Sequence, residues 1–338
     1  MRPAGSDGRS GGGPGGGGGP GGGGGGPTNL PATESGEAPL EARFETPSPI
    51  DLALSLDPLS HGPADPTIKV GRDGVWLARR TGSGPATIRI WTAPGGDAVL
   101  AQAWGPGAEA ALAAVPGLAG LLDNPTPLVG PHALVHELER RFPELRFPRT
   151  GQLTTALIPA VIGQKVTAGE AHASYLALIR RAGDPAPGPA GLRLPPSSFR
   201  VAALPYFEFH PMGLERRRAE VLRHICGLEV KIESWLSLPP DEARAKLRLI
   251  PGIGPWTAAE ATREAFGDPD AVSVGDAHIP HLVSWALAGE PRGDDTRMLE
   301  LLAPYEGQRG RVIRLLEAAR IKIPRFGPRF SPGHIERL

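Results

Sequence analysis

The stretch that decides the fold is Leu249-Ile-Pro-Gly-Ile-Gly-Pro-Trp-Thr-Ala258. Apolar residues at helical spacing flank it, which predicts two helices, over 241–249 and 256–266, joined by a tight turn. Gly252 and Gly254 permit positive φ in this turn and are expected to bring bare backbone to the surface. The second helix would point its free N–H groups at this turn, as phosphate-binding sites do. The residues expected to contact a phosphate backbone here are Pro251, Gly252, Ile253, Gly254 and Thr257.

A second informative stretch is Val272-Ser-Val-Gly-Asp-Ala-His-Ile279, in which Asp276 lies 20 positions after Trp256. Asp276 follows Gly275 and precedes an apolar run, so we place it at the N-terminus of a helix over 278–287. Taken alone, an aspartate there is an N-cap, a role that this residue type favours. The glycine turn upstream favours a second interpretation, in which Asp276 is a functional carboxylate.

These two stretches resemble a known superfamily. PGIGPWTA resembles the helix-hairpin-helix of DNA base-excision glycosylases, and residues 272–279 resemble the segment that carries their essential aspartate. Within it the chain is most similar to the DNA-3-methyladenine glycosylase II branch, which acts in alkylation repair. Trp256 stands where lyase-competent relatives carry lysine, residues 158–167 resemble that branch's helix near the DNA, and a sheet domain precedes the helices. The resemblance covers residues 45–320.

The resemblance implies a chemistry for Asp276. Cleavage of an N-glycosidic bond builds positive charge on the deoxyribose, and a nearby carboxylate would stabilise it and orient or deprotonate the attacking water. Since Trp256 replaces the lysine, no Schiff base would form and an abasic site would remain. We therefore expect a monofunctional DNA glycosylase of base-excision repair. Its substrate would be a damaged base, an alkylated purine, flipped out of double-stranded DNA, and it would need no cofactor and no metal.

The pocket for the flipped base is expected to involve Trp256, Glu260 and Gln164. Trp256 would offer an aromatic surface, although a Trp at a helix start is commonly a core anchor. Glu260 departs from the aromatic residue of the family; it would bond an amino group or a cationic base, or face solvent. Lys165 occupies the position of the family's apolar wedge, and we expect it to contact DNA. For Gln164 and Lys165 a polar helix face remains the alternative.

The charges give no simple indication of a nucleic-acid partner, since Lys and Arg total 36 and Asp and Glu total 36. Residues 251–300 carry 3 basic and 9 acidic side chains, whereas residues 301–338 carry 8 and 3. Arg309 and Arg311, at the start of the last helix, are predicted DNA contacts, although basic clusters are more often solvated faces. His278 and His281 lack the neighbouring ligands of a metal site.

The N-terminal third divides into two parts. Residues 1–40 hold 17 of the 47 glycines, so residues 1–42 are predicted to be a disordered, Gly/Pro-rich leader. Residues 43–130 contain short runs separated by Gly, Pro and Asp, which predicts an antiparallel sheet domain. The expected strands are 51–56, 67–70, 74–79, 86–91 and 98–104.

From residue 131 to residue 322 the pattern is helical. Thr167 and Glu170 predict a capping box, and the proline-rich stretch 184–196 is predicted to be a linker. The helices expected after that linker are 212–226, 230–236, 241–249, 256–266, 278–287, 295–302 and 308–320. Residues 323–338 form a basic, Pro-rich tail. The predicted fold class is α+β: a small N-terminal antiparallel sheet domain followed by an all-α helix-hairpin-helix glycosylase domain.

Some classes of protein are excluded. The single cysteine, Cys226, rules out intramolecular disulfides and cysteine-ligated iron–sulfur clusters. The sequence has neither an apolar run of membrane-spanning length nor a signal-peptide pattern. We expect a monomer in the cytoplasm, associated with the nucleoid of a bacterial-type cell and not with a membrane. The alternative function is a helix-hairpin-helix DNA-binding protein that is non-catalytic or differently specialised, which would not need Asp276.

Overall fold

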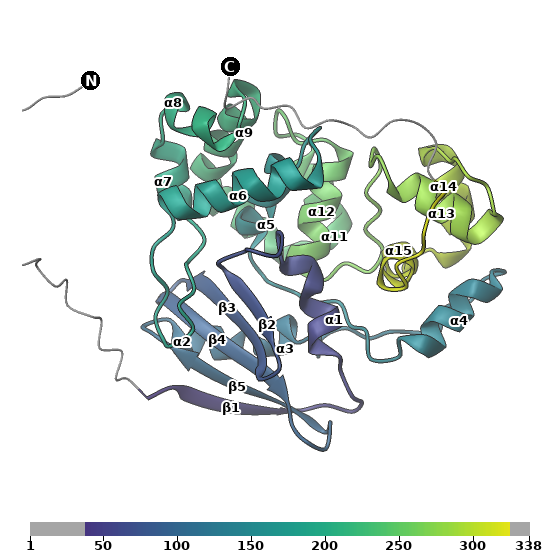
Figure 1. The fold of residues 1–338 in the computed structure, drawn as a ribbon, viewed down its shortest axis with the longest axis horizontal. Coiled ribbons are helices and arrows are strands. Elements are labelled where there is room, and N and C mark those ends of the chain that lie inside the picture. Colours follow the sequence, from purple (N-terminus) through teal and green to yellow (C-terminus); the bar gives the residue numbers. More distant parts are fainter. Residues whose placement is uncertain (1–37, 325–338) are drawn as a thin grey trace, which may run out of the picture. The chain divides into compact units, whose positions relative to one another are not determined.

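A five-stranded antiparallel sheet begins the described part of the chain, which comprises residues 38–324 of this computed structural model (Figure 1). The strand order is β1-β5-β4-β3-β2, so β4 is central and β1 and β2 form the edges. The strands are β1 (Leu40–Glu45), β2 (Ile68–Gly71), β3 (Gly74–Thr81), β4 (Gly84–Thr92) and β5 (Ala98–Trp104). The predicted antiparallel sheet is confirmed, and the expected leader boundary at residue 42 falls inside β1.

One face of the sheet packs against three short helices. They are α1 (Leu52–Leu56), α2 (Ala108–Ala113) and α3 (Val115–Leu118). Ile88 and Ile90 of β4 are fully buried in this core beside Leu118 of α3. Because alternate side chains of a strand point to opposite faces, β4 supplies both residues to one side. This apolar layer is the core of the N-terminal part.

Helix α1 corrects one prediction, since residues 51–56 were expected to form a strand. The Asp51 side chain accepts a hydrogen bond from the backbone N–H of Leu54 (2.9 Å) and so caps the helix. Leu52, Ser55 and Leu56 are the buried residues, which is helical spacing. The alternating apolar residues of this five-residue run fit both the two-residue period of a strand and the 3.6-residue period of a helix. The Asp51 cap favours the helix.

The opposite face of the sheet is covered by the proline-rich stretch 184–196. The indoles of Trp76 and Trp104 stack on this face with their ring centroids 5.3 Å apart, and Leu192 and Leu194 pack against them. The stretch predicted to be a linker is therefore part of the packed structure. It ties the helical part of the chain back to the sheet.

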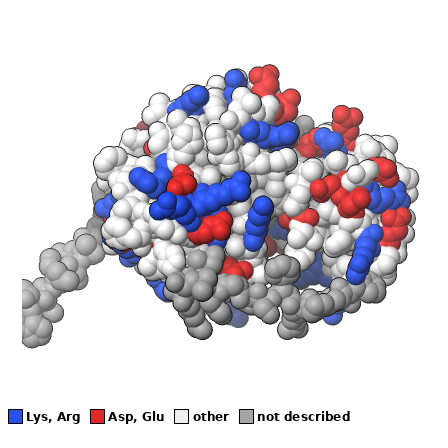
Figure 2. Space-filling model, turned by 90° about the horizontal axis from the view of Figure 1, so that it is seen from above, with Lys and Arg blue, Asp and Glu red and all other residues white. Residues whose placement is uncertain are grey.

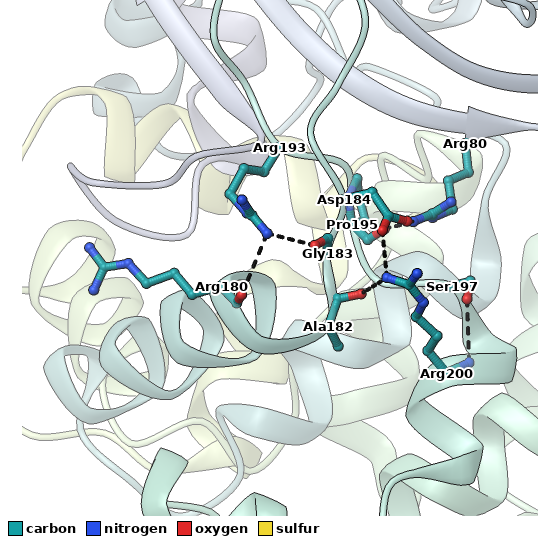
Figure 3. Close-up of polar contacts among 9 residues, drawn as sticks. All are labelled: Arg80, Arg180, Ala182, Gly183, Asp184, Arg193, Pro195, Ser197 and Arg200. Atoms are coloured by element: carbon teal, nitrogen blue, oxygen red, sulfur yellow. Dashed lines mark hydrogen bonds and ion pairs between the residues drawn. The ribbon is translucent and has the colours of Figure 1, made fainter. Parts of the chain in front are cut away.

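Asp184 fixes one end of that stretch (Figure 3). Its carboxylate accepts from Arg80 of β3 and from Arg200, each at 2.5 Å. Arg80 also donates to the carbonyl of Pro195 (2.7 Å), at the other end of the stretch. Two ends of one segment are thus held by a single arginine of the sheet. The same close-up shows Arg193 donating to the carbonyl of Gly183.

The main helical core is built around α5 (Leu153–Ile162), which is apolar on all sides. Eight of its ten residues are buried, as expected of a central helix. It packs against α12 (Pro255–Phe266) and α9 (Arg216–Gly227). The other helices around this core are α6 (Ala168–Ala182), α7 (Ser198–Ala203), α8 (Tyr206–Phe209), α10 (Glu229–Ser234) and α11 (Pro240–Leu247).

A second helical cluster has its own apolar core. It contains α4 (Ala133–Arg141), α13 (Ile279–Ala288), α14 (Asp295–Leu302) and α15 (Arg309–Ala318). Short 3-10 helices at Asp57–Leu59, His210–Met212, Trp235–Ser237 and Ala303–Tyr305 complete the elements. Within residues 38–324, no helix is both long and apolar enough to cross a membrane.

Most of the helix predictions after residue 200 are confirmed to within a few residues. The prediction over 295–302 matches α14, and the capping box is present, since Thr167 accepts from the N–H of Glu170 and Glu170 accepts from the N–H of Thr167. Helices α7 and α8 were not predicted. Residues 1–37 and 325–338, which hold most of the predicted leader and tail, lie outside the described residues.

The junction between the sheet part and α15 contains a buried ion pair that generates a prediction. Arg311 and Asp123 pair at 2.5 Å with side chains only 6% and 4% exposed, and Asp123 also accepts from the N–H of Phe147. We expect Asp123→Ala to lower the free energy of unfolding by about 3–5 kcal/mol, because it leaves a buried guanidinium without its counter-charge. Urea denaturation measures this change.

The control is Asp97→Ala, which removes the exposed partner of Arg43. That variant should change the free energy of unfolding by less than about 1 kcal/mol. Equal effects of the two substitutions would contradict the role given to the buried pair.

Candidate active site

The predicted hairpin lies between α11 and α12, and its two glycines differ. Gly252 has φ +90°, and a Cβ there would overlap the side chain of Val221. Gly254 has φ −90° and ψ 179°, an extended backbone open to any residue, so it does not use the positive φ that glycine permits. A Cβ at Gly254 would meet no atom within 4 Å. Gly252 is therefore required by the fold, whereas Gly254 leaves open space on the turn.

Gln164 holds this turn against the end of α5. Its Nε2 donates to the carbonyl of Gly252 (2.9 Å) and to Oγ1 of Thr257 (2.8 Å). Thr257 and Ile253 are buried, so of the predicted contact residues these two offer backbone at most. Gln164 lies in the wall of the cavity described below, but its amide is committed to the hairpin.

Lys165 follows Gln164 in an unusual backbone conformation. It has φ +56°, the left-handed region that non-glycine residues rarely adopt, and its side chain is exposed. Such strain persists where the surroundings fix it, and it clusters at functional sites. The left-handed turn places Lys165 at the mouth of the cavity.

Asp276 combines the two roles that the sequence left open. Its Oδ1 accepts hydrogen bonds from the backbone N–H groups of His278 (2.7 Å) and Ile279 (2.9 Å), at the start of α13. Its Oδ2 accepts from the indole Nε1 of Trp256 at 2.8 Å. The carboxylate therefore caps a helix and also faces the cavity. Three donors fix the position of the carboxylate.

Trp256 is half-buried and joins the hairpin to this carboxylate. Besides its bond to Asp276, its indole lies over Gly163, where a Cβ would stand 3.2 Å from the ring atom Cη2. One edge of the indole packs on Gly163, and the ring lines the cavity. Trp256 is therefore both a core anchor and part of the pocket wall. A larger residue at 163 would displace the indole.

The cavity has a volume of about 1600 Å³. Its walls come from α1, α5, α6, α12 and α15, together with residues 146–148 and 275–278. Trp256, Glu260, Arg263 and Glu264 line it from one face of α12, at positions i, i+4, i+7 and i+8. The cavity gathers charged side chains, among them Glu260, Arg263 and Asp276, which makes it a candidate ligand site.

After Trp256, the residues of α12 that line the cavity are charged and not aromatic, whereas Phe147 and Tyr175 line it from other segments. Glu260 accepts from the hydroxyl of Ser273 and from Arg263 (2.6 Å), so it is engaged within the protein and does not simply face solvent. Burial raises the pKa of Glu264 to about 7, which leaves this carboxyl partly protonated at neutral pH. Burial likewise raises the pKa of Glu317, on α15. Neither Arg263 nor Glu264 was predicted from the sequence to be a site residue. Their spacing of seven and eight residues from Trp256 places them on the same helix face, and this spacing was the signal that could have found them.

The arginines predicted to contact DNA are paired within the protein. Arg311 is buried against Asp123, with only 6% of its side chain exposed, so its guanidinium is engaged within the protein and little of it is open to a phosphate. Arg309, the first residue of α15, donates three hydrogen bonds to Asp270, two from its guanidinium and one from its backbone N–H. Figure 2 shows acidic and basic side chains interspersed on one face of the molecule, with uncharged areas between them. Among the described residues on that face, no large area carries charges of only one sign.

The two histidines considered in the sequence, His278 and His281, lie in different surroundings: His278 lines the cavity, whereas the ring of His281 faces the backbone of Gly293. Nδ1 of His281 accepts from the backbone N–H of Gly293 (3.2 Å), which takes up one of its two ring nitrogens. Within residues 38–324 there is no group of three His, Cys, Asp or Glu that would hold a metal ion.

The comparison with solved structures agrees with this architecture. The 3-methyladenine DNA-glycosylase from Archaeoglobus fulgidus matches with a TM-score of 0.67 and 19% identity, over 82% of this chain and 98% of that one. The apo 8-oxoguanine glycosylase/lyase from Clostridium acetobutylicum matches with a TM-score of 0.60 and 12% identity, over 83% and 98%. The chain has the fold of the helix-hairpin-helix DNA glycosylases. No protein-family model matches the sequence, and no curated protein sequence matches it either.

This fold puts the hairpin, the aspartate and the cavity in one place. The Clostridium acetobutylicum protein also matches in a complex with double-stranded DNA, with a TM-score of 0.54 and 13% identity, over 75% of this chain and 96% of that one. At these identities the likeness concerns the fold. The function has to be argued from the residues of this chain.

The two hairpin glycines give a prediction. We expect Gly254→Ala to fold normally and to weaken binding to a DNA duplex about tenfold or more, since its methyl group would block one hydrogen bond to a phosphate. Gly252→Ala should instead lower the stability of the fold, because of its positive φ and the overlap with Val221. Fluorescence anisotropy with a labelled duplex and urea denaturation separate the two effects. Wild-type affinity in Gly254→Ala would exclude the turn as a phosphate site.

Proposed function

We propose that this protein is a monofunctional DNA glycosylase. It hydrolyses the N-glycosidic bond of a damaged base that has been flipped out of duplex DNA, and it leaves an abasic site for base-excision repair. The observation that carries this proposal is the carboxylate of Asp276, which is fixed by the Trp256 indole at the wall of a large cavity beside a bare backbone turn. A structural N-cap needs neither the indole nor the cavity.

Asp276 is the catalytic residue of the proposal. Departure of the base leaves positive charge on the sugar, and a preorganised carboxylate stabilises it without reorganisation. Oδ1 accepts two backbone N–H groups and Oδ2 accepts the indole, which leaves acceptor capacity on Oδ2. That capacity orients the attacking water and takes its proton as the new C–O bond forms.

Trp256 supports the monofunctional assignment. A lyase needs an amine that forms a Schiff base with the sugar. Among the described residues that line the cavity, Lys165 is the one lysine, and it is exposed at the mouth. Water is therefore the nucleophile of the proposed reaction.

The DNA would be held chiefly through backbone N–H groups of the hairpin. Gly252 and Gly254 would offer their backbone N–H groups, whereas Pro251 has no N–H and that of Ile253 donates to the carbonyl of Ile250 (3.0 Å), so neither of these two donates to a phosphate. Lys165, which is exposed and lines the cavity, would contact a phosphate with its ammonium group. Arg217 lines the same cavity and is exposed, so it can add a phosphate contact. Binding of this kind does not depend on sequence, since phosphates carry no sequence information.

The substrate proposed is an alkylated purine. The cavity lining includes the carboxyl groups of Asp276, Glu260, Glu264 and Glu317, of which Glu260 and Glu317 pair with Arg263 and Arg314. Alkylation makes a purine electron-poor or cationic, and such a base is stabilised by carboxylates and by the face of an indole.

Asp276→Asn tests the catalytic role. Asparagine is as good an N-cap as aspartate, so α13 should persist. Loss of the negative charge should lower the rate of base excision by about 10²–10³-fold. The measurement uses duplexes with single alkylated, deaminated or oxidised bases, followed by alkaline cleavage of abasic sites. Asp97→Asn, on the exposed turn before β5, is the matched control.

The outcomes separate the two functions. No product with any lesion, together with intact binding of duplex DNA, would assign the chain to the non-catalytic DNA-binding class. An Asp276→Asn variant that excises bases at the wild-type rate would remove Asp276 from the mechanism.

The salt dependence of DNA binding tests Lys165. The logarithm of the affinity should fall linearly with the logarithm of the salt concentration, and Lys165→Ala should reduce the slope by about 1. Lys231→Ala is the control. Lys231 lies on α10, which packs near the start of α5, whereas Lys165 follows the end of α5. An unchanged slope in Lys165→Ala would show that this lysine does not contact phosphate.

A further inference from the structure

The cavity face of α12 continues below the proposed reaction centre. Arg263 and Glu264 lie seven and eight residues after Trp256, which is about 10–12 Å along the helix axis. Side chains of a helix lean toward its N-terminus, and in α12 that end carries the hairpin and Trp256. These two side chains are therefore placed to meet the edge of a flipped base that lies farthest from the sugar.

Arg263 is held in place by a short chain of contacts. The hydroxyl of Ser273 donates to Oε1 of Glu260, and Nη2 of Arg263 donates to Oε2 of Glu260. One nitrogen of the guanidinium is thereby fixed, and further N–H donors remain on a group that lines the cavity. The Glu260 carboxylate thus orients Arg263.

Glu264 differs from Glu260 because its carboxyl group accepts no hydrogen bond from the described residues, although the charge of Arg263 acts on it. Among the residues that the structure describes, none forms a hydrogen bond or an ion pair with its carboxyl group. A carboxyl that is partly buried in a cavity wall and lacks donors costs free energy, and donors of a ligand would remove that cost. The carboxyl therefore points to a ligand with N–H groups.

This inference rests on the proposed function and makes its substrate more specific. We propose that Arg263 and Glu264 read the far edge of the flipped base and select purines of guanine type. Guanine offers the O6 acceptor and, from N1 and N2, adjacent N–H donors. Glu264 accepts from the two N–H groups, and Arg263 donates to O6. Adenine has an unprotonated N1 at the same edge. Because this nitrogen is an acceptor, it cannot donate a hydrogen bond to the carboxylate of Glu264.

The experiment compares two alkylated bases that differ in this edge. Duplexes with a single 7-methylguanine or a single 3-methyladenine are incubated with the protein at pH 8, where Glu264 is ionised. We expect 7-methylguanine to be released faster. In Glu264→Gln, an isosteric change, the ratio of the two rates should fall by about tenfold or more, because one acceptor becomes a donor.

The control is Glu109→Gln, an exposed position on α2 that should leave the ratio unchanged. A structural role for Glu264 would lower both rates equally, and so would not move the ratio. Equal release of the two bases by the wild type, or an unchanged ratio in Glu264→Gln, would overturn the inference.

A binding measurement distinguishes this inference from the proposed function. Isothermal titration of the free bases 7-methylguanine and 3-methyladenine into the wild type and Glu264→Gln does not require cleavage. Selective binding of 7-methylguanine that Glu264→Gln abolishes, without excision from any duplex, would refute the glycosylase and retain the base-edge reading. Excision of a damaged base, without selective binding of free 7-methylguanine, would support the glycosylase and refute the base-edge reading.

Discussion

The structure depends on how α12 divides its surface. One face carries the small residues Ala258, Ala261 and Ala265, which are fully buried and let the helix pack closely on α5. The other face carries Trp256, Glu260, Arg263 and Glu264, and it lines the cavity. Because both faces belong to one rigid helix whose N-terminus is the hairpin, the backbone turn and the cavity wall cannot move independently.

The sheet part contributes to the site through its packing. Residues 146–148 lie in the cavity wall, and Arg146 is buried, with its guanidinium bound to the carbonyl groups of Pro143 and Leu145. Helix α1, whose core lies on the sheet, supplies Ser55 to the same wall. The Asp123–Arg311 pair joins this part of the chain to α15, which lines another side of the cavity. The cavity exists because segments from three apolar cores meet around it.

Elements with strong local signals could be predicted from the sequence. Predictions failed where contacts between residues far apart in the sequence determine the conformation or the partner of a side chain. The glycine turn, the capping box at Thr167 and the start of α14 depend on neighbouring residues, and they were predicted correctly. The stretch 184–196 was taken for a linker because its cover of Trp76 and Trp104 is made by tertiary packing alone. Arg311 was taken for a DNA contact because charge patterns do not show a partner 188 positions away.

Asp276 was ambiguous in the sequence because one part of its hydrogen bonding is local and the other part is not. Its two backbone bonds to residues 278 and 279 are local, so the N-cap interpretation could be predicted from the sequence. Its bond to the Trp256 indole joins elements 20 residues apart and sets the direction of the second oxygen. A helix cap alone leaves that oxygen to solvent, whereas here it faces a cavity.

Internal pairing of the arginines also shapes how this chain would approach DNA. Arg309 and Arg311 are engaged by Asp270 and Asp123, so their charge is largely cancelled before any ligand arrives. A bare turn at a helix N-terminus needs no side-chain charge to hold a phosphate, because its N–H groups and the helix dipole attract the anion. Neutral overall composition is then consistent with a DNA ligand. Such a contact also places the helix that bears Trp256 and Glu264 at a fixed distance from the phosphate backbone, which a flexible arginine would not do.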